Sequence, residues 1–204
     1  MKRYLAAGIV AIVASAPLWA QDQVAEPKTG VQFSTKADGK TLLGVGLRVK
    51  TFLVKWKVYA VGLYVADSAL AGPLAAHKGK VGTPAFYKDL VWGDFDKHVT
   101  LKFVRNVGQD KIQSTMREAL EGKTDKALLD RFVSYFPEIK EGQECTLRWA
   151  PGGTLEVVMA GQPREPIANK EFAAAVFGLY LGEQPLQEDI KKGLVSRAAE
   201  LLKP

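Results

Sequence analysis

The stretch GVGLRVKTFLVKWKVYAVGLYV, residues 44–65, decides the fold of this 204-residue chain. It is rich in valine, leucine and aromatic residues, and therefore predicts two adjoining strands. Arg48 lies among apolar neighbours in the first strand, and Tyr59 lies in the second. A guanidinium cannot lose its proton and is costly to bury without a partner. Arg48 is therefore either a surface residue with a buried stem or an anion-binding group at the mouth of an apolar space.

Further strands are expected on both sides of this stretch. Residues 31–35 alternate as a strand does, and Asp38-Gly39 is a turn pair typical of hairpins. Residues 98–105 alternate, with Arg105 ending the apolar face and His98 on the polar face. Residues 144–150 and 154–160 predict a hairpin across Pro-Gly-Gly.

The expected helices lie mostly in the second half of the chain. Residues 109–121 carry an apolar stripe, and a second helix is expected from an N-cap at Thr124 to residue 136. Asn169 predicts the cap of a third helix to about residue 180, and Pro185 the start of a last one. Residues 67–82 are ambiguous between helix and loop. Hairpins dominate over strand–helix alternation, which favours an α+β fold with a mainly antiparallel sheet and helices on one face.

The N-terminus has the pattern of a secretory signal. A basic start precedes an apolar run over residues 4–14, and a small residue, Ala20, marks the expected cleavage site. An uncleaved anchor is the alternative. We expect residues 1–20 to be a signal peptide, 21–30 a flexible leader and 31–204 one domain, in a protein that is periplasmic or secreted.

Charge and composition exclude several classes of function. Without Lys2 and Arg3, 26 basic residues stand against 22 acidic ones, and no basic run indicates nucleic-acid binding. The excess would suit peripheral contact with anionic lipid or capture of an anionic ligand, although solubility alone also explains it. The sequence contains no metal-ligand spacing and no dinucleotide motif, so we expect neither metal nor cofactor. Oligomeric state is left open.

Three residue types that are common at reactive or ligand-binding sites have simpler structural interpretations in this sequence. Cys145 is the single cysteine, so no internal disulfide forms, and its strand alternation predicts a buried packing residue. His98 is expected to be solvated on the polar face of its strand rather than to act as an acid or base. Gly44 and Gly46 predict a close backbone approach or a bulge.

The motif Gly44-x-Gly46-x-Arg48, followed by Lys57-x-Tyr59-Ala60-x-Gly62-x-Tyr64, resembles the first core motif of the chalcone isomerase superfamily. The similarity extends from about Val31 to the C-terminus and is strongest to the bacterial branch. It implies an open-faced β-sandwich, a large and mainly antiparallel sheet packed on a layer of helices. In the fatty-acid binders of the superfamily, an arginine and a tyrosine at matching places hold the carboxylate. This implies that Arg48 and Tyr59 are ligand-binding residues.

Arg105 is a candidate second anion contact, with a surface or interface cation as the alternative. The flavonoid isomerases of the superfamily need further polar groups. By this resemblance, Tyr59 replaces a threonine, and the isomerase tyrosine, asparagine and serine or threonine fall on Gly108, Thr115 and Ala173.

The resemblance therefore implies no catalytic residue and a protein that binds a small apolar carboxylate such as a fatty acid. One alternative is an intramolecular lyase or isomerase that acts on an enone-like substrate through Arg48. The other is an envelope protein-interaction module whose pocket is closed.

Overall fold

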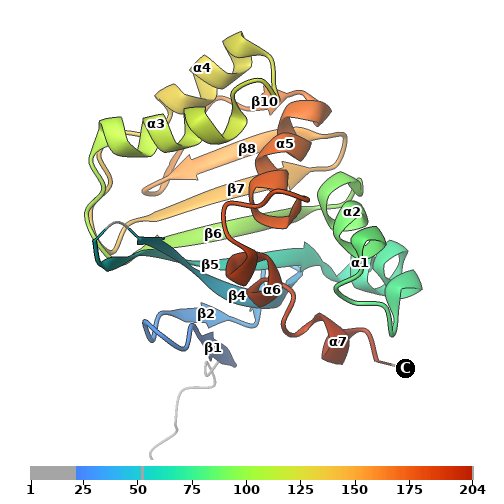
Figure 1. Ribbon diagram of the computed structural model, residues 1–204. Helices are drawn as coiled ribbons and strands as arrows, with labels where there is room; N and C mark the ends of the chain where they lie inside the picture. The colour runs from blue at the N-terminus through green and yellow to red at the C-terminus, as the bar shows by residue number, and fades with distance from the viewer. Residues whose placement is uncertain (1–21, 52, 204) are drawn as a thin grey trace, which may run out of the picture.

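The computed structural model of the chain describes residues 22–51 and 53–203. Its centre is a curved antiparallel sheet, which Figure 1 shows behind a layer of helices. The strands follow the order β10-β8-β7-β6-β5-β4-β3, and β9 pairs with β8. Their bounds are Lys36–Ala37 (β3), Lys40–Thr51 (β4), Lys55–Ala66 (β5), Lys97–Phe103 (β6), Glu144–Ala150 (β7), Thr154–Met159 (β8), Gln162–Pro163 (β9) and Ile167–Ala168 (β10).

The helices cover one face of this sheet (Figure 1). They are Asp67–Ala71 (α1), Pro84–Trp92 (α2), Gln109–Leu120 (α3), Lys126–Ser134 (α4), Lys170–Leu181 (α5), Glu188–Gly193 (α6) and Ala198–Leu201 (α7), with a 3-10 turn, η1, at Pro73–His77. The hairpin of β1 (Gln23–Ala25) and β2 (Gln32–Ser34) lies against the other face. The predicted α+β class, with a large antiparallel sheet packed on helices, is confirmed.

Two apolar clusters lie on opposite faces of the sheet. The larger one fills the space between sheet and helices, where Trp149 packs edge-on against Phe177 with ring centroids 6.2 Å apart. Cys145 is fully buried in this cluster, as predicted. The smaller cluster joins Phe33 of β2 to Leu42, Val45, Ala60 and Tyr64 of β4 and β5.

Glycines allow the C-terminal segment to touch β4. A Cβ on Gly44 would overlap the carbonyl oxygen of Gly193, and a Cβ on Gly46 would lie 3.1 Å from the Cα of Ile190. Gly44 also follows a register shift, between Leu42 and Gly44. Both expectations for these glycines, a close backbone approach and a bulge, are therefore confirmed.

A second bulge separates Arg48 from Val49. Arg48 pairs with Tyr59 and Val49 pairs with Lys57, so Val58 is an extra residue in β5. Paired residues share a face of the sheet. Beyond the bulge the alternation of β5 is therefore reversed: Trp56, which pairs with Lys50, shares the helix-side face with Tyr59. In a regular strand two residues three positions apart would face opposite sides.

Several expected boundaries differ from the structure. Within residues 21–30, expected to be a flexible leader, Gln23–Ala25 form β1 and pair with β2. The N-cap of α4 is Asp125 rather than Thr124, since its carboxylate accepts from the amides of Ala127 and Leu128. The last expected helix is two short helices, α6 and α7. β6 ends at Phe103, so Arg105 lies beyond the strand.

His98 is buried rather than solvated. It stacks on Tyr64 with ring centroids 4.6 Å apart, and only 8% of it is exposed. The expected signal peptide lies outside the described residues. Within residues 22–51 and 53–203, no helix is long and apolar enough to cross a membrane.

Candidate functional site

A cavity of about 350 Å³ lies between β4 and β5, the start of α3 and the segment that precedes α6. Its apolar wall comes from Val58, Ile112, Met116 and Leu186. Four cations also line it, and no carboxylate does so in the described part of the chain. Those cations are Arg48, Lys50, Arg105 and Lys111. An apolar space with convergent polar groups is the usual form of a small-molecule site, and the volume is at the lower end of the common range of about 300–1,000 Å³.

Arg48 is held at this cavity by the segment before α6. Its Nη1 donates to the carbonyl oxygen of Leu186 at 2.8 Å and to Oε1 of Gln187 at 3.5 Å. Oε1 of Gln187 also accepts from the backbone amide of Val49 at 3.1 Å. Among the described residues, no carboxylate pairs with Arg48. The guanidinium therefore has a fixed position and an uncompensated charge.

Tyr59 lies directly opposite Arg48 in the β4–β5 register and lines the same cavity. Its ring packs edge-on against Phe103, with centroids 5.3 Å apart. Burial raises the pKa of Tyr59 to about 12, although the Arg48 charge and the neighbouring Tyr180 act in the opposite direction. Tyr59 is therefore a neutral hydrogen-bond donor at physiological pH.

The cations at the cavity repel one another. The pKa of Lys50 is lowered, first by its contact with Lys111, then by partial burial and then by the charges of Lys111 and Arg48. Glu118 on α3 acts in the opposite direction. The guanidinium of Arg105 lies 4.3 Å from the centroid of the Trp56 ring. A bound anion would relieve this crowding of positive charge.

All three residues that the sequence indicated as ligand-binding, Arg48, Tyr59 and Arg105, line this one cavity. Of the positions assigned by resemblance to isomerase polar groups, Gly108 and Thr115 line it, whereas Ala173 is buried in the core of α5. Sequence reasoning missed Lys50, Trp56 and Lys111. Lys50 is two residues from Arg48 in the same strand, so strand alternation could have placed both on one face. Trp56 could not be found in this way, because the bulge at Val58 reverses which residues of β5 face the helices.

Two buried titratable groups lie away from the cavity. Nζ of Lys97 donates to the carbonyls of Val91 and Gly93, at the C-terminal end of α2, and lies 4.0 Å from the centroid of the Trp149 ring. Its burial lowers its pKa to about 7. Burial likewise lowers the pKa of His98 to about 4. The hydrogen bonds of Lys97 to carbonyls and the stacking of His98 on Tyr64 explain why these two side chains are buried, without any role at a site.

The model of the chalcone isomerase-like family matches residues 23–196. This protein belongs to the chalcone isomerase-like family. Its relatives include fatty-acid-binding protein 1 of Arabidopsis thaliana, 28% identical over 89% of this chain and 72% of the relative. Fatty-acid-binding protein 2 of the same plant is 26% identical over 91% of this chain, which spans only 53% of that relative. Chalcone–flavanone isomerase 1A of Glycine max is 28% identical over 83% of this chain and 89% of the relative.

A solved structure extends these similarities to the fold. The crystal structure of a fatty-acid-binding protein from Arabidopsis thaliana superposes with a TM-score of 0.77 at 25% identity, covering 89% of this chain and 99% of that one. Within the chalcone isomerase-like family, this protein therefore resembles both binding proteins and isomerases in sequence. The superposition confirms that its sheet and helices have the arrangement of the fatty-acid binder.

Proposed function

We propose that this chalcone isomerase-like protein binds a small apolar carboxylate, such as a fatty acid, in the cavity beside β4 and β5. The observation that carries the proposal is the combination of four cations with an apolar wall in one space. Arg48 and Tyr59 donate to the carboxylate, and the tail packs against Ile112, Met116 and Leu186. The similarity to two plant fatty-acid-binding proteins supports this choice of ligand.

Non-catalytic binding agrees better with the side chains at the cavity than ring closure of an enone does. At the positions compared with isomerase polar groups, Gly108 brings no side chain to the cavity and Ala173 lies outside its lining. Electrostatic catalysis requires donors placed where charge develops on the substrate. The absence of turnover with a panel of enones, together with fatty-acid binding, would separate the two functions.

Titration with soluble fatty acids of increasing chain length tests the proposal. Isothermal calorimetry on the purified protein should show saturable binding at one site. Arg48→Gln should weaken binding by about tenfold or more, since a charge-assisted hydrogen bond to the ligand contributes roughly 1.5–3 kcal/mol. No binding by the unaltered protein, together with no lipid in an extract of freshly purified protein, would exclude a fatty-acid ligand.

The chain offers a matched control for Arg48→Gln. Arg197 also links β4 to the C-terminal segment, since its Nη1 donates to the carbonyl of Leu42 at 2.6 Å, but it does not line the cavity. Arg197→Gln therefore removes a similar structural contact without touching the ligand site. Equal weakening of binding in both variants would indicate a loss of structure rather than of a carboxylate contact.

We also propose that the protein acts in the periplasm or outside the cell after removal of residues 1–20. The basic start, short apolar run and small residue at position 20 support this location. N-terminal sequencing of protein recovered from a periplasmic fraction should begin at Gln21. Recovery of the intact N-terminus from the cytoplasm would contradict the proposal.

A further inference from the structure

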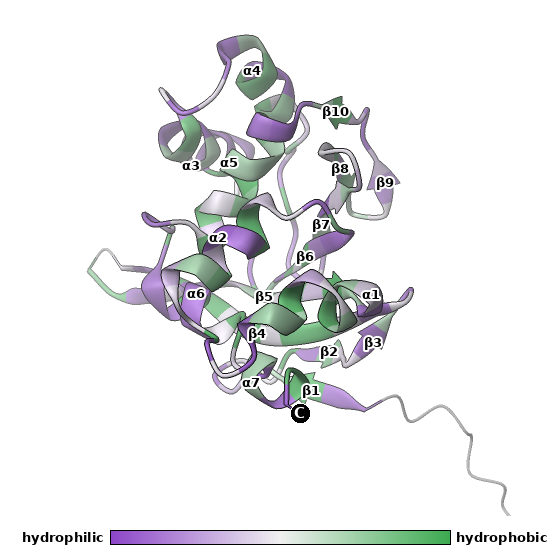
Figure 2. Ribbon diagram, turned by 90° about the vertical axis from the view of Figure 1, so that its right-hand side faces the viewer, coloured by the Kyte–Doolittle hydropathy of each residue, from purple (hydrophilic) through white to green (hydrophobic). Residues whose placement is uncertain are grey.

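The tip of the β4–β5 hairpin exposes large hydrophobic side chains. Leu53 is 89% exposed, Val54 53% and Trp56 47%. Figure 2 shows the hairpin projecting at the left, with hydrophobic and hydrophilic residues side by side. Phe52 lies outside the described residues. A group of exposed apolar residues on one projection costs solubility and is typical of an interaction surface.

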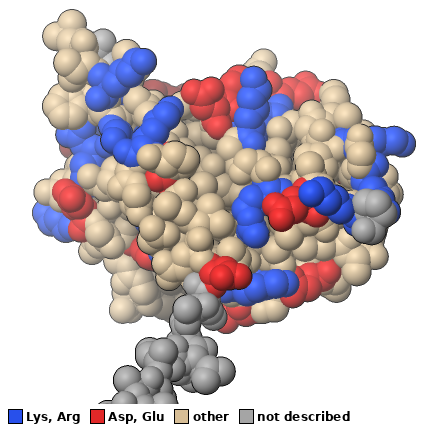
Figure 3. All heavy atoms as spheres, turned by 90° about the horizontal axis from the view of Figure 1, so that it is seen from below, with Lys and Arg blue, Asp and Glu red and all other residues tan. Residues whose placement is uncertain are grey.

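Cations surround this apolar tip on both faces of the hairpin. Lys50 lies on the helix-side face, and Lys57 lies on the opposite face, where its Nζ donates to the backbone carbonyl of Lys28. Lys55 is exposed next to the tip, and Arg105 stacks on Trp56. In Figure 3 a projection without acidic residues stands at the upper left, with blue Lys and Arg side chains beside it.

We propose that the β4–β5 hairpin docks on an anionic lipid bilayer, with Leu53, Val54 and Trp56 inserted among the acyl chains and the flanking cations on the headgroups. Apolar burial and attraction to anionic lipid are the two terms that hold interfacial segments to membranes. Each lysine or arginine near such a surface adds to the attraction. A second copy of the chain is a poor partner for this tip, because the lysine and arginine side chains around the two tips would repel each other.

The docked hairpin would place the cavity at the bilayer surface. Lys50, Trp56 and Arg105 belong both to the hairpin surface and to the lining of the cavity. A lipid-derived carboxylate could then pass between membrane and cavity along one continuous apolar and cationic path. The docking itself does not depend on the proposed ligand, so either proposal can fail while the other stands.

Vesicle sedimentation with the purified full chain tests the docking. We expect binding to vesicles of phosphatidylglycerol and phosphatidylcholine that exceeds binding to phosphatidylcholine alone and falls with salt. The double variant Leu53→Ser/Val54→Ser should reduce partitioning by at least tenfold. Because neither residue lines the cavity, the variant should keep the affinity of the unaltered protein for a soluble fatty acid.

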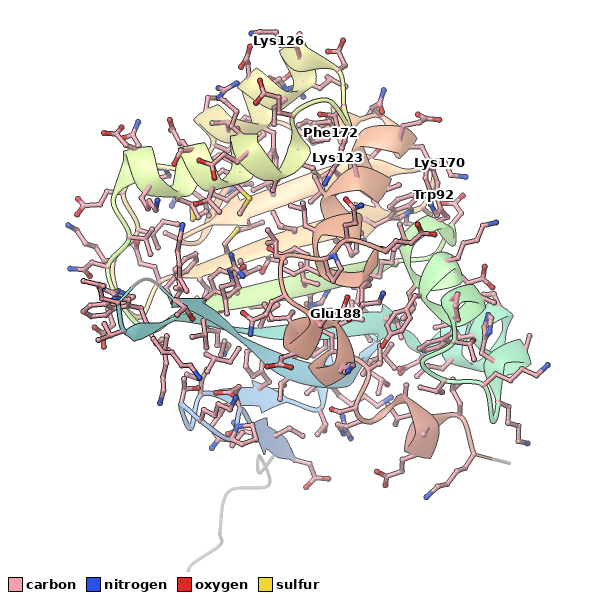
Figure 4. All side chains as sticks on the ribbon, viewed as in Figure 1. Trp92, Lys123, Lys126, Lys170, Phe172 and Glu188 are labelled. Atoms are coloured by element: carbon pink, nitrogen blue, oxygen red, sulfur yellow. The ribbon has the colours of Figure 1, made fainter. Side chains whose placement is uncertain are left out.

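Tryptophan quenching by brominated acyl chains locates the contact. Trp92 provides a matched control, since it is 46% exposed and lies on α2, away from the hairpin tip (Figures 1 and 4). Trp56→Phe keeps an apolar ring at the tip, so vesicle binding should persist while the hairpin's quenching signal disappears. Trp92→Phe should leave the quenching unchanged. Residues 1–21 are common to all variants and add the same background to each.

Three results would overturn the proposal. The first is the absence of vesicle binding, and the second is unchanged partitioning of the Leu53→Ser/Val54→Ser variant when its circular dichroism matches the parent. The third is a loss of quenching in Trp92→Phe instead of Trp56→Phe. If vesicle binding is absent, self-association that the double variant abolishes would assign the tip to a dimer instead.

Discussion

The phenol of Tyr180 lies close to that of Tyr59, and within residues 22–51 and 53–203 its fully buried hydroxyl has no hydrogen-bond partner. The pair is close enough for each tyrosine to affect the pKa of the other, and burial raises the pKa of Tyr180 well above its usual value. Tyr59 faces the cavity, whereas Tyr180 does not line it. An unsatisfied polar atom in an apolar setting therefore lies next to the candidate site, behind its lining residues.

Removing that hydroxyl should stabilise the protein. Tyr180→Phe should raise the free energy of unfolding by about 1 kcal/mol, because an unpartnered buried hydroxyl costs roughly 1–3 kcal/mol. Tyr64→Phe is the matched control: it loses a hydrogen bond of 2.9 Å to the carbonyl of Ser34 and should lower that free energy by about 1 kcal/mol. Urea denaturation measures both, and destabilisation by Tyr180→Phe would show that its hydroxyl has a partner.

The contact between β4 and the C-terminal segment predicts opposite effects for two glycine substitutions. Gly44→Ala should destabilise the fold by about 2 kcal/mol or more, because its Cβ would overlap the Gly193 carbonyl and the backbone amide of Ser196. Gly178→Ala, inside α5 with open space around it, should stabilise by up to about 1 kcal/mol. Thermal denaturation compares them. A neutral Gly44→Ala would mean that this contact opens at little cost.

His98 predicts a loss of stability in mild acid. Burial lowers its pKa to about 4 in the folded protein, below the usual value of 6.5 that the unfolded chain approaches. Between these values only the unfolded chain binds the proton, so stability falls as pH decreases from about 6.5 towards 4. We expect a loss of about 2 kcal/mol between pH 7 and pH 5.

Denaturant titrations at the two pH values measure this loss, and His98→Gln should remove most of it. The groups that face His98 with opposing effects are Lys40, Asp96, Asp38 and Arg148, and Asp96 has a pKa lowered below 3.8 by Arg148 and Lys40 against its burial. Asp96 therefore titrates below the chosen window. Equal pH dependence in His98→Gln and the parent would assign the loss to another group.

The N-terminus of α4 distinguishes two candidate caps. Asp125→Ala should lower the free energy of unfolding by about 1 kcal/mol, since it removes the acceptor for the amides of Ala127 and Leu128. Thr124→Ala should have little effect, because its hydroxyl makes only a 3.4 Å contact with the carbonyl of Leu120. A larger loss of unfolding free energy in Thr124→Ala than in Asp125→Ala would show that Thr124 is the N-cap, as the sequence predicts.

Sequence patterns predicted the strands and the capped helices well, and tertiary contacts account for the errors. Asn169 does cap α5, since its side chain accepts from the amide of Phe172 at 2.8 Å. The prediction that His98 is solvated was wrong because the β1–β2 hairpin builds a second, smaller core on the face of the sheet opposite the helices. On that face Tyr64 stacks on the histidine ring. The local alternation of β6 contains no information about that distant hairpin.

The candidate site likewise contains some residues that the sequence indicates and others that only tertiary packing brings to the cavity. Arg48 and Tyr59 were accessible to sequence reasoning because each stands out from its strand and both match a family motif. Lys111 comes from α3 and reaches the cavity only through the packing of that helix. Trp56 was hidden because no sequence alternation reveals the bulge opposite Arg48 and Val49.

Val58, the extra residue of that bulge, determines which residues on either side of it in β5 share a face of the sheet. It allows Tyr59 and Trp56, three positions apart, to face the same space, so the floor of the cavity and the base of the exposed tip are on one surface. One residue inserted between Arg48 and Val49 would leave every side chain present, but it would give Val58 a pairing partner, and the regular alternation would then turn Trp56 to the face opposite Tyr59. Family members could thus gain or lose the connection between cavity and tip by a change of one residue in the length of β4, without any substitution.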